Sequence, residues 1–258
     1  MAPTGHKIDI RNWRTFALSL IGLCAAVPAF AQNRAEIPEG CTPLYTMQKA
    51  SCEVETLFTC DKGRDVRFIS LVYDTEGLNL IEVEDAEYRF LSAAYPQSGM
   101  QISNTPISGE ESLSGLLETG ISEYVEHLEF SSADGTSFTA EGRFTVKLTD
   151  RKVVIDGETL FEIDRSSLIR YSVGESTEQN VGVGYYYPRF AVLMSGRNRQ
   201  TGVNGVTVSD TSPITFDFEG DRGFLVTVPL FGCGVISELP RKLQLACADA
   251  HCRDGDVR

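Results

Sequence analysis

Apolar and polar residues alternate with a period of two along most of this sequence, a pattern typical of half-buried β-strands. In the segment 52–60, for example, Val54 and Phe58 fall on one face and acidic residues on the other. The dipeptides Asp134-Gly135 and Asp156-Gly157 lie between such segments and are typical of hairpin turns. Roughly a dozen strands at this spacing predict an all-β fold, mainly antiparallel, that is either a sandwich or a barrel.

The strand pattern is interrupted once, before Gly120. The stretch Tyr95–Gly109 is rich in Pro, Gly, Ser and Asn, so we expect a loop there. One short helix of about 10 residues should follow, with Ser108 as its N-cap and Glu111 completing a capping box. The leucines of this helix share one face, and Gly120 is its expected end.

The N-terminus has the three parts of a Sec signal peptide. Basic residues precede an apolar run over 16–30, and Ala29-Phe30-Ala31 supplies a small-x-small cleavage site. We therefore expect residues 1–31 to be removed and residues 32–258 to fold in the periplasm as one β domain without a membrane anchor. The form of the signal and the absence of an N-x-[ST] site indicate a bacterial protein. The alternatives are an uncleaved anchor and a split into two domains near 95–109.

Six of the seven cysteines would remain after cleavage, in two groups of three near the chain ends. They are Cys41, Cys52 and Cys60, then Cys233, Cys247 and Cys252. In an oxidising compartment these predict three disulfides. An odd number in each group then requires at least one bridge between the groups, which would clasp the two ends of the domain. Cys52 and Cys60 should not pair, because the ends of one strand over 52–60 lie about 26 Å apart against a limit of about 7 Å.

The charge balance restricts the class of partner. The chain has 36 Asp and Glu against 23 Lys and Arg, a formal net charge of −13. Nucleic-acid binding needs a dense positive surface, and anionic lipid also attracts basic segments, so both partners are disfavoured. The expected partner is a small ligand or another periplasmic protein.

Signatures of catalysis are mostly absent: the sequence has no G-x-S-x-G, S-x-x-K or H-E-x-x-H motif. His127 is the only histidine within the strand-rich region, and a hydrolase that uses His127 is one hypothesis. A surface or half-buried structural histidine is the simpler interpretation. The acidic run at Glu82, Glu84, Asp85 and Glu87 is expected to be a solvated strand end.

The sequence offers two weak candidates for a metal site, and no cofactor is expected. The spaced carboxylates of Asp217, Glu219 and Asp221 resemble a calcium loop, although alternation also explains them as the wet face of a strand. A zinc site formed by Cys247, His251 and Cys252 is the alternative to disulfides, but its spacing matches no common zinc motif.

One segment combines tyrosines and arginines in an otherwise acidic chain. Tyr185–Met194 is long enough for one strand, and a turn near Gly196 would place the next two arginines at a hairpin tip. Tyrosine rings and guanidinium groups suit sugar faces or anionic groups, and an ordinary solvated tip is the alternative. The candidate binding residues here are Tyr185, Tyr187, Arg189, Arg197 and Arg199.

A part of the chain within 52–118 resembles C-type lysozyme inhibitors, which are small disulfide-bonded β-barrels. The resemblance rests on Thr59-Cys60-Asp61, Val72-Tyr73-Asp74 and Ser98-Gly99, which follow the order of that family's landmarks. It implies inhibition of a cell-wall hydrolase, with Ser98 on an exposed loop. The chain departs from the family at Met100-Gln101-Ile102 and lacks its Trp-containing motif. A non-catalytic periplasmic protein with a binding or structural role is the leading hypothesis, and such an inhibitor is the alternative.

Overall fold

The computed structural model describes residues 34–61, 68–109 and 111–233, and within them thirteen strands and one helix. The strands are β1 (Cys41–Lys49), β2 (Glu53–Cys60), β3 (Phe68–Asp74), β4 (Gly77–Glu84), β5 (Phe90–Tyr95), β6 (Met100–Gly109), β7 (Ile121–Ser131), β8 (Ser137–Ile155), β9 (Glu158–Tyr171), β10 (Thr177–Tyr187), β11 (Val192–Gly202), β12 (Gly205–Asp210) and β13 (Pro213–Asp217). The helix α1 (Leu113–Thr119) lies between β6 and β7. The all-β prediction with one short helix is confirmed.

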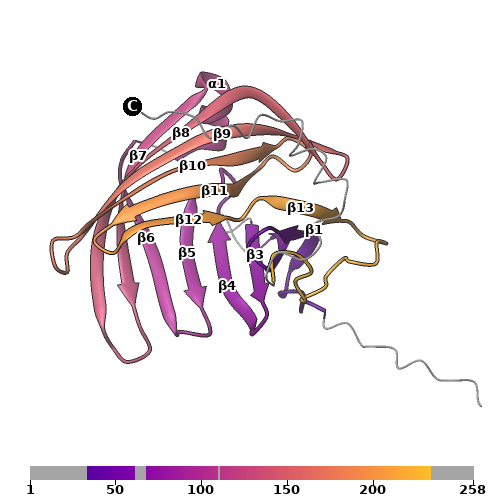
Figure 1. Ribbon diagram of the computed structural model, residues 1–258, viewed down its shortest axis with the longest axis horizontal. Coiled ribbons are helices and arrows are strands. Elements are labelled where there is room, and N and C mark those ends of the chain that lie inside the picture. The colour runs from indigo at the N-terminus through magenta and orange to yellow at the C-terminus, as the bar shows by residue number, and fades with distance from the viewer. Residues whose placement is uncertain (1–33, 62–67, 110, 234–258) are drawn as a thin grey trace, which may run out of the picture. The chain divides into compact units, whose positions relative to one another are not determined.

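All described strands belong to one antiparallel sheet (Figure 1). From β1 to β12 each strand pairs with its neighbours in the sequence, and β13 then returns to pair with β1. The two ends of the sheet, β12 and β13, are therefore consecutive in the chain. The ladder of hydrogen bonds does not close into a barrel.

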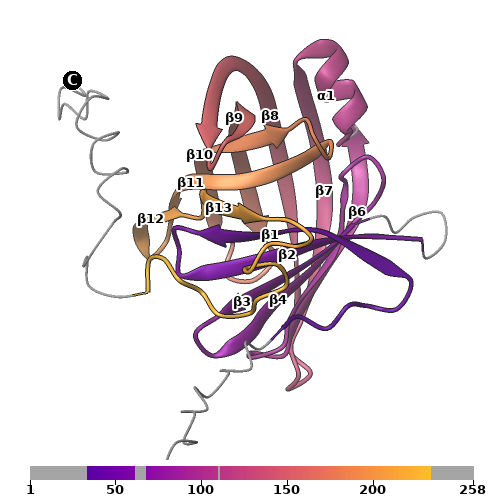
Figure 2. The same ribbon diagram turned by 90° about the vertical axis from the view of Figure 1, so that its right-hand side faces the viewer.

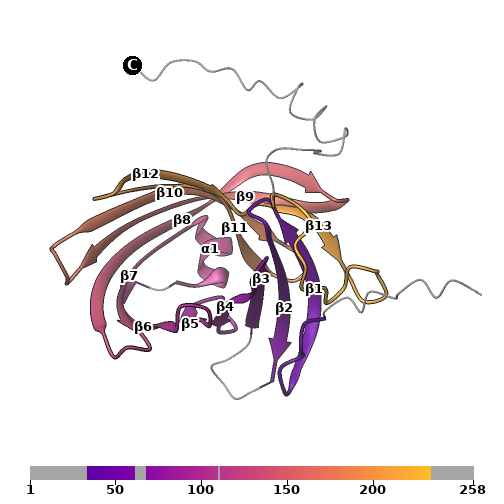
Figure 3. The ribbon, with the colours of Figure 1, turned by 60° about the horizontal axis from the view of Figure 1, so that its bottom comes forward.

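The sheet curls so that β1–β3 face β9–β11 across a shared interior (Figure 3). Tyr45 of β1 packs on Tyr187 of β10 and on Phe216 of β13, with ring centroids 6.1 and 5.7 Å apart. The free edge of β13 is held by the turn between β8 and β9, where the Asp156 carboxylate accepts a hydrogen bond from the Phe216 amide at 2.9 Å. Aromatic packing and this side-chain bond thus hold the curl where the strand ladder stops.

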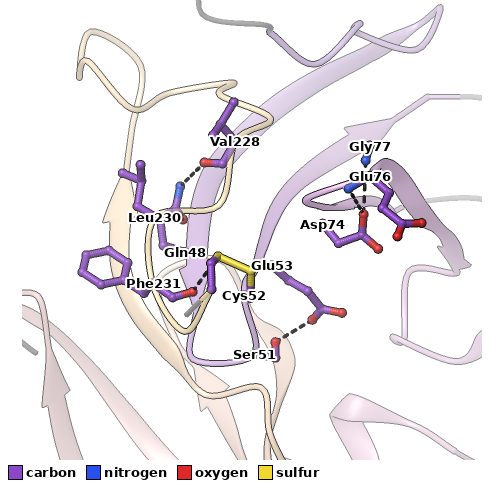
Figure 4. The surroundings of a disulfide bond; sticks show 11 residues. Gln48, Ser51, Cys52, Glu53, Asp74, Glu76, Gly77, Val228, Leu230 and Phe231 are labelled. Carbon is purple, nitrogen blue, oxygen red and sulfur yellow. Dashed lines mark hydrogen bonds between the residues drawn. A yellow bond between two sulfur atoms is a disulfide. The ribbon is translucent and has the colours of Figure 1, made fainter. Parts of the chain in front are cut away.

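Segments near the two ends of the described chain cover the outer face of β1–β4. Ala35, Phe224 and Leu225 pack there against buried side chains of β2 and β3. Gln48 of β1, only 1% exposed, donates to the Val228 carbonyl at 3.3 Å and accepts from the Leu230 amide at 2.8 Å (Figure 4). β1 is consequently buried on both faces, although it lies next to the sheet's end.

Two disulfides reinforce this covering layer. Cys41 pairs with Cys60 across β1 and β2, and Cys52 pairs with Cys233 over a sequence separation of 181 (Figure 4). The bridge between the two cysteine groups that parity requires is therefore Cys52–Cys233. Cys247 and Cys252 lie outside the described residues.

The helix α1 lies beside one end of β7 (Figure 2). Ser112 is its N-cap, because the Ser112 hydroxyl accepts from the Gly115 amide at 3.1 Å. Gly120 ends it in the left-handed conformation, with a φ of 79°, and the predicted stop is confirmed. The predicted cap Ser108 is wrong, since that residue belongs to β6 and the helix begins one turn later.

Two other boundary predictions are wrong and one strand was missed, each for a physical reason. Most of the expected loop at Tyr95–Gly109 is β6, whose proline is accommodated beside an irregularity in the pairing with β7. The expected strand Tyr185–Met194 is two strands, because a turn at residues 188–191 separates β10 from β11. β1 was not predicted, since a strand buried on both faces lacks clean alternation.

Candidate functional site

The interior of the curled sheet contains a polar cavity of about 310 Å³. Its wall carries charged side chains from β1, β2, β4 and β9, and one from the segment between β6 and α1. Five of them are carboxylates and two are cationic: Glu53, Glu55, Glu82, Glu84, Glu111, Lys49 and Arg165. Such a concentration of charge inside a β-sheet fold is the feature that most needs a functional explanation.

Strand alternation turns the acidic residues of β4 inward. Glu82 and Glu84 line the cavity, whereas Ile81, which precedes Glu82 in β4, packs into the outer apolar cluster. The acidic run containing these residues was expected to be solvated, and this interpretation is wrong for Glu82, Glu84 and Asp85. Asp85, in the same run, is buried and accepts hydrogen bonds from the Glu87 amide at 2.8 Å and the Arg89 amide at 3.0 Å.

Lys49 neutralises one side of the cavity. Its ammonium lies 3.1 Å from the Glu55 carboxylate and 3.3 Å from that of Glu53, and Lys49 is only 7% exposed. Burial lowers the pKa of Lys49, but the two carboxylates outweigh this effect and leave the pKa above its usual value. The Ser70 hydroxyl adds a hydrogen bond to Glu55 at 3.1 Å, so this group of charges is internally satisfied.

Glu82 has no such partner: within the described residues no hydrogen bond or ion pair engages its carboxyl group. The side chain lines the cavity and is half-buried. Burial, followed by the nearby Glu55 charge, raises the pKa of Glu82 to about 7. Burial and the charge of Glu82 also raise the pKa of Glu84 well above its usual value, against a hydrogen bond from Tyr88.

Glu111 closes the cavity beside the helix. Its carboxylate accepts from the Phe90 amide at 3.0 Å and from the Tyr124 hydroxyl at 2.7 Å. Burial raises the pKa of Glu111 in spite of these hydrogen bonds. The predicted capping box is therefore wrong, because the Glu111 carboxylate binds neighbouring elements and not the start of its own helix.

Arg165 of β9 is the second cation of the cavity, and within the described residues no carboxylate lies within ion-pair distance of it. Its guanidinium donates to the Ser195 hydroxyl at 3.3 Å. Gly184 on β10 also lies close to Arg165, because a Cβ added at Gly184 would lie 3.1 Å from Arg165 Cδ and 2.5 Å from the Met194 carbonyl oxygen. The absence of a side chain at Gly184 thus leaves room for the arginine.

The predicted tyrosine and arginine residues do not form one site. Tyr187 is buried, and both its hydroxyl and the Arg189 guanidinium donate to Glu158, the latter at 2.9 Å. Tyr185 contacts the Ser212 hydroxyl at 3.2 Å. Arg197 and Arg199 lie within β11, so their predicted place at a hairpin tip near Gly196 is wrong. Arg197 is 3.3 Å from Asp210 on β12.

Ser98 and His127 both lie outside the cavity. Ser98 is exposed in the short turn between β5 and β6, where its hydroxyl accepts from the Met100 amide at 3.3 Å. Inhibition of a cell-wall hydrolase through this turn stays a hypothesis. His127 is half-exposed on β7, and its Nε2 lies 3.8 Å from Glu129 Oε1.

The calcium candidates hold a turn together. Asp217 accepts from the Gly223 amide at 3.1 Å, and Asp221 accepts from the Phe218 amide at 2.8 Å. Glu219 is exposed. No group of three or more metal-ligating side chains with suitable geometry occurs in the described part of the chain. All three zinc candidates lie outside that part of the chain: Cys247, His251 and Cys252.

Comparisons with protein-family models, with curated proteins and with solved structures find no match to this chain. Among the described residues, no helix is both long enough and apolar enough to span a membrane.

Proposed function

We propose that this chain is an exported, non-catalytic binding protein whose interior cavity holds a small molecule with a positively charged group, such as a primary ammonium. The observation that carries the proposal is Glu82, a carboxyl group that faces the cavity and has no partner within the described residues. Lys49 is already engaged by Glu53 and Glu55, so it does not neutralise Glu82 directly. A bound ammonium would supply the missing donor.

The energetics of burial support this proposal. A carboxyl group without a hydrogen-bond partner costs free energy inside a protein, and the cost rises when it ionises. Tyr45, fully buried on the same face of the sheet, also has a hydroxyl without a partner. An apolar side chain would fill either position more favourably, so folding alone does not explain these groups. His127, the candidate catalytic histidine, lies outside the cavity, which favours binding over hydrolysis.

Binding of n-butylammonium should become about tenfold tighter between pH 6 and pH 8. The pKa of Glu82 is about 7, so its carboxyl group is mostly protonated at pH 6 and mostly ionised at pH 8, whereas the amine stays charged. Isothermal titration calorimetry at both pH values measures the change. E82Q should weaken binding at pH 8 at least tenfold and abolish the pH dependence.

The matched control is E129Q, which removes a carboxylate whose side chain is 63% exposed outside the cavity. It should leave the affinity for n-butylammonium unchanged. Absence of saturable binding at either pH, or equal effects of E82Q and E129Q, would reject the cavity as a cation site.

Export predicts the N-terminus of the mature protein. Periplasmic material from bacterial expression should begin at Gln32 by N-terminal sequencing and intact mass, and should lack the fluorescence of Trp13, the only tryptophan. A29R, which removes the small residue three positions before the cleavage site, should retain the leader. A wild-type periplasmic protein that keeps Trp13 would contradict the proposal.

A further inference from the structure

Arg165 lies where the acidic cavity meets a second polar hollow. A groove of about 310 Å³ runs over β8–β12, and Arg165, Ser195 and Thr211 line both spaces. The groove is rich in hydroxyl and amide groups, including Asn180 and Asn198, and no carboxylate is among its described lining residues. The charge of the lining therefore changes from mainly acidic to purely cationic at Arg165.

A simple ammonium ion matches only the acidic part of this lining and leaves Arg165 without an anionic partner. It would gain attraction from Glu82 and Glu84 but would be repelled by Arg165. The charge of Arg165 already acts on Glu82, since it is one of the influences that lower the pKa of that carboxyl group. A guanidinium presents a planar fork of donors that matches a carboxylate or phosphate oxygen pair. Only the Ser195 hydroxyl engages that fork among the described residues, which leaves donors free.

We infer that the ligand is a small zwitterion, with its ammonium group among Glu82, Glu84 and Glu111 and its anionic group on Arg165 and Ser195 at the entrance to the groove. This inference rests on the proposed function, because it assigns the second end of the same ligand. The ligand's ammonium group then meets carboxylates, and its anionic group meets the guanidinium of Arg165. Arg165 therefore attracts one end of the ligand, whereas it would repel an ammonium ion alone. A cavity of this size suits a ligand of roughly ten non-hydrogen atoms, since one water occupies about 30 Å³.

The test compares molecules that share an ammonium group. Calorimetry at pH 8 should show that 4-aminobutanoate, 6-aminohexanoate or O-phosphoethanolamine binds at least tenfold more tightly than n-butylammonium, and that butanoate binds more weakly than either class. A tighter ω-amino acid indicates a carboxylate ligand, and a tighter phosphoethanolamine indicates a phosphate ligand. Saturable binding of n-butylammonium with no gain for any zwitterion would overturn this inference and leave the proposed function standing. Absence of binding by all probes would reject both.

R165Q separates the two ends of the ligand. It should remove the zwitterion's tenfold advantage while leaving the affinity for n-butylammonium unchanged or improved, because a like charge has been removed. R165K keeps the charge but not the fork and should retain part of the advantage. The matched control is R143Q, which alters an exposed arginine of β8 that lines neither hollow and should have no effect. Equal losses for R165Q with both probe classes would contradict the assignment.

Discussion

Replacing the crossing disulfide by serines, in C52S/C233S, is expected to lower the free energy of unfolding by about 5 kcal/mol. The bridge closes a loop across 181 positions, and cross-linking so distant a pair removes a large conformational entropy from the unfolded chain. It also holds the segment that covers the outer face of β1, where Gln48 binds Val228 and Leu230. Urea unfolding followed by circular dichroism, with intact-mass confirmation of the remaining disulfides, measures the loss.

The internal bridge supplies the control. C41S/C60S opens a link between residues only 19 positions apart, for which the same chain-entropy relation gives about 3 kcal/mol. The crossing pair should therefore cost about 2 kcal/mol more than the internal pair. Equal losses, or a smaller loss for C52S/C233S, would show that the crossing bridge is not the main covalent support of the fold.

Replacing Lys49 by methionine is expected to destabilise the protein by about 3–5 kcal/mol at pH 8. The substitution keeps most of the side-chain volume but leaves Glu53 and Glu55 beside the cavity without their cation. Negative charge without a partner beside the cavity then costs free energy in the folded variant. The stability loss should consequently shrink as the pH falls from 8 to 5, because protonation removes the uncompensated charge.

Two further variants test whether the effect of K49M comes from the ion pairs of Lys49 with Glu53 and Glu55. K147M, at an exposed position of β8, should change the free energy of unfolding by less than about 0.5 kcal/mol. K49M/E55Q should recover part of the stability lost in K49M, because it removes one of the stranded carboxylates. A K49M loss that does not depend on pH would indicate a packing effect and contradict the electrostatic explanation.

The all-β class and the end of the helix at Gly120 could be predicted from the sequence because each depends on local chemistry. Alternation with a period of two, turn dipeptides and a left-handed glycine act over a few residues. The bridge between the two cysteine groups also follows from the sequence, since it is a matter of parity. The choice of Cys52 and Cys233 for that bridge depended on the fold, which brings the turn after β1 to the segment that covers β1.

The candidate site could not be predicted, because alternation separates the two faces of a strand without saying which face becomes the interior. In β4 the curl of the sheet places Glu82 and Glu84 inside and Ile81 outside, the reverse of the usual arrangement for an exposed sheet. Arg165 lies far from these residues in the sequence, and only the packing of β9 opposite β1–β4 brings them to one cavity. The sequence by itself determined the β-strand class of the fold, whereas the direction of the curl, set by long-range aromatic packing and the covering segments, decided which charges were buried together.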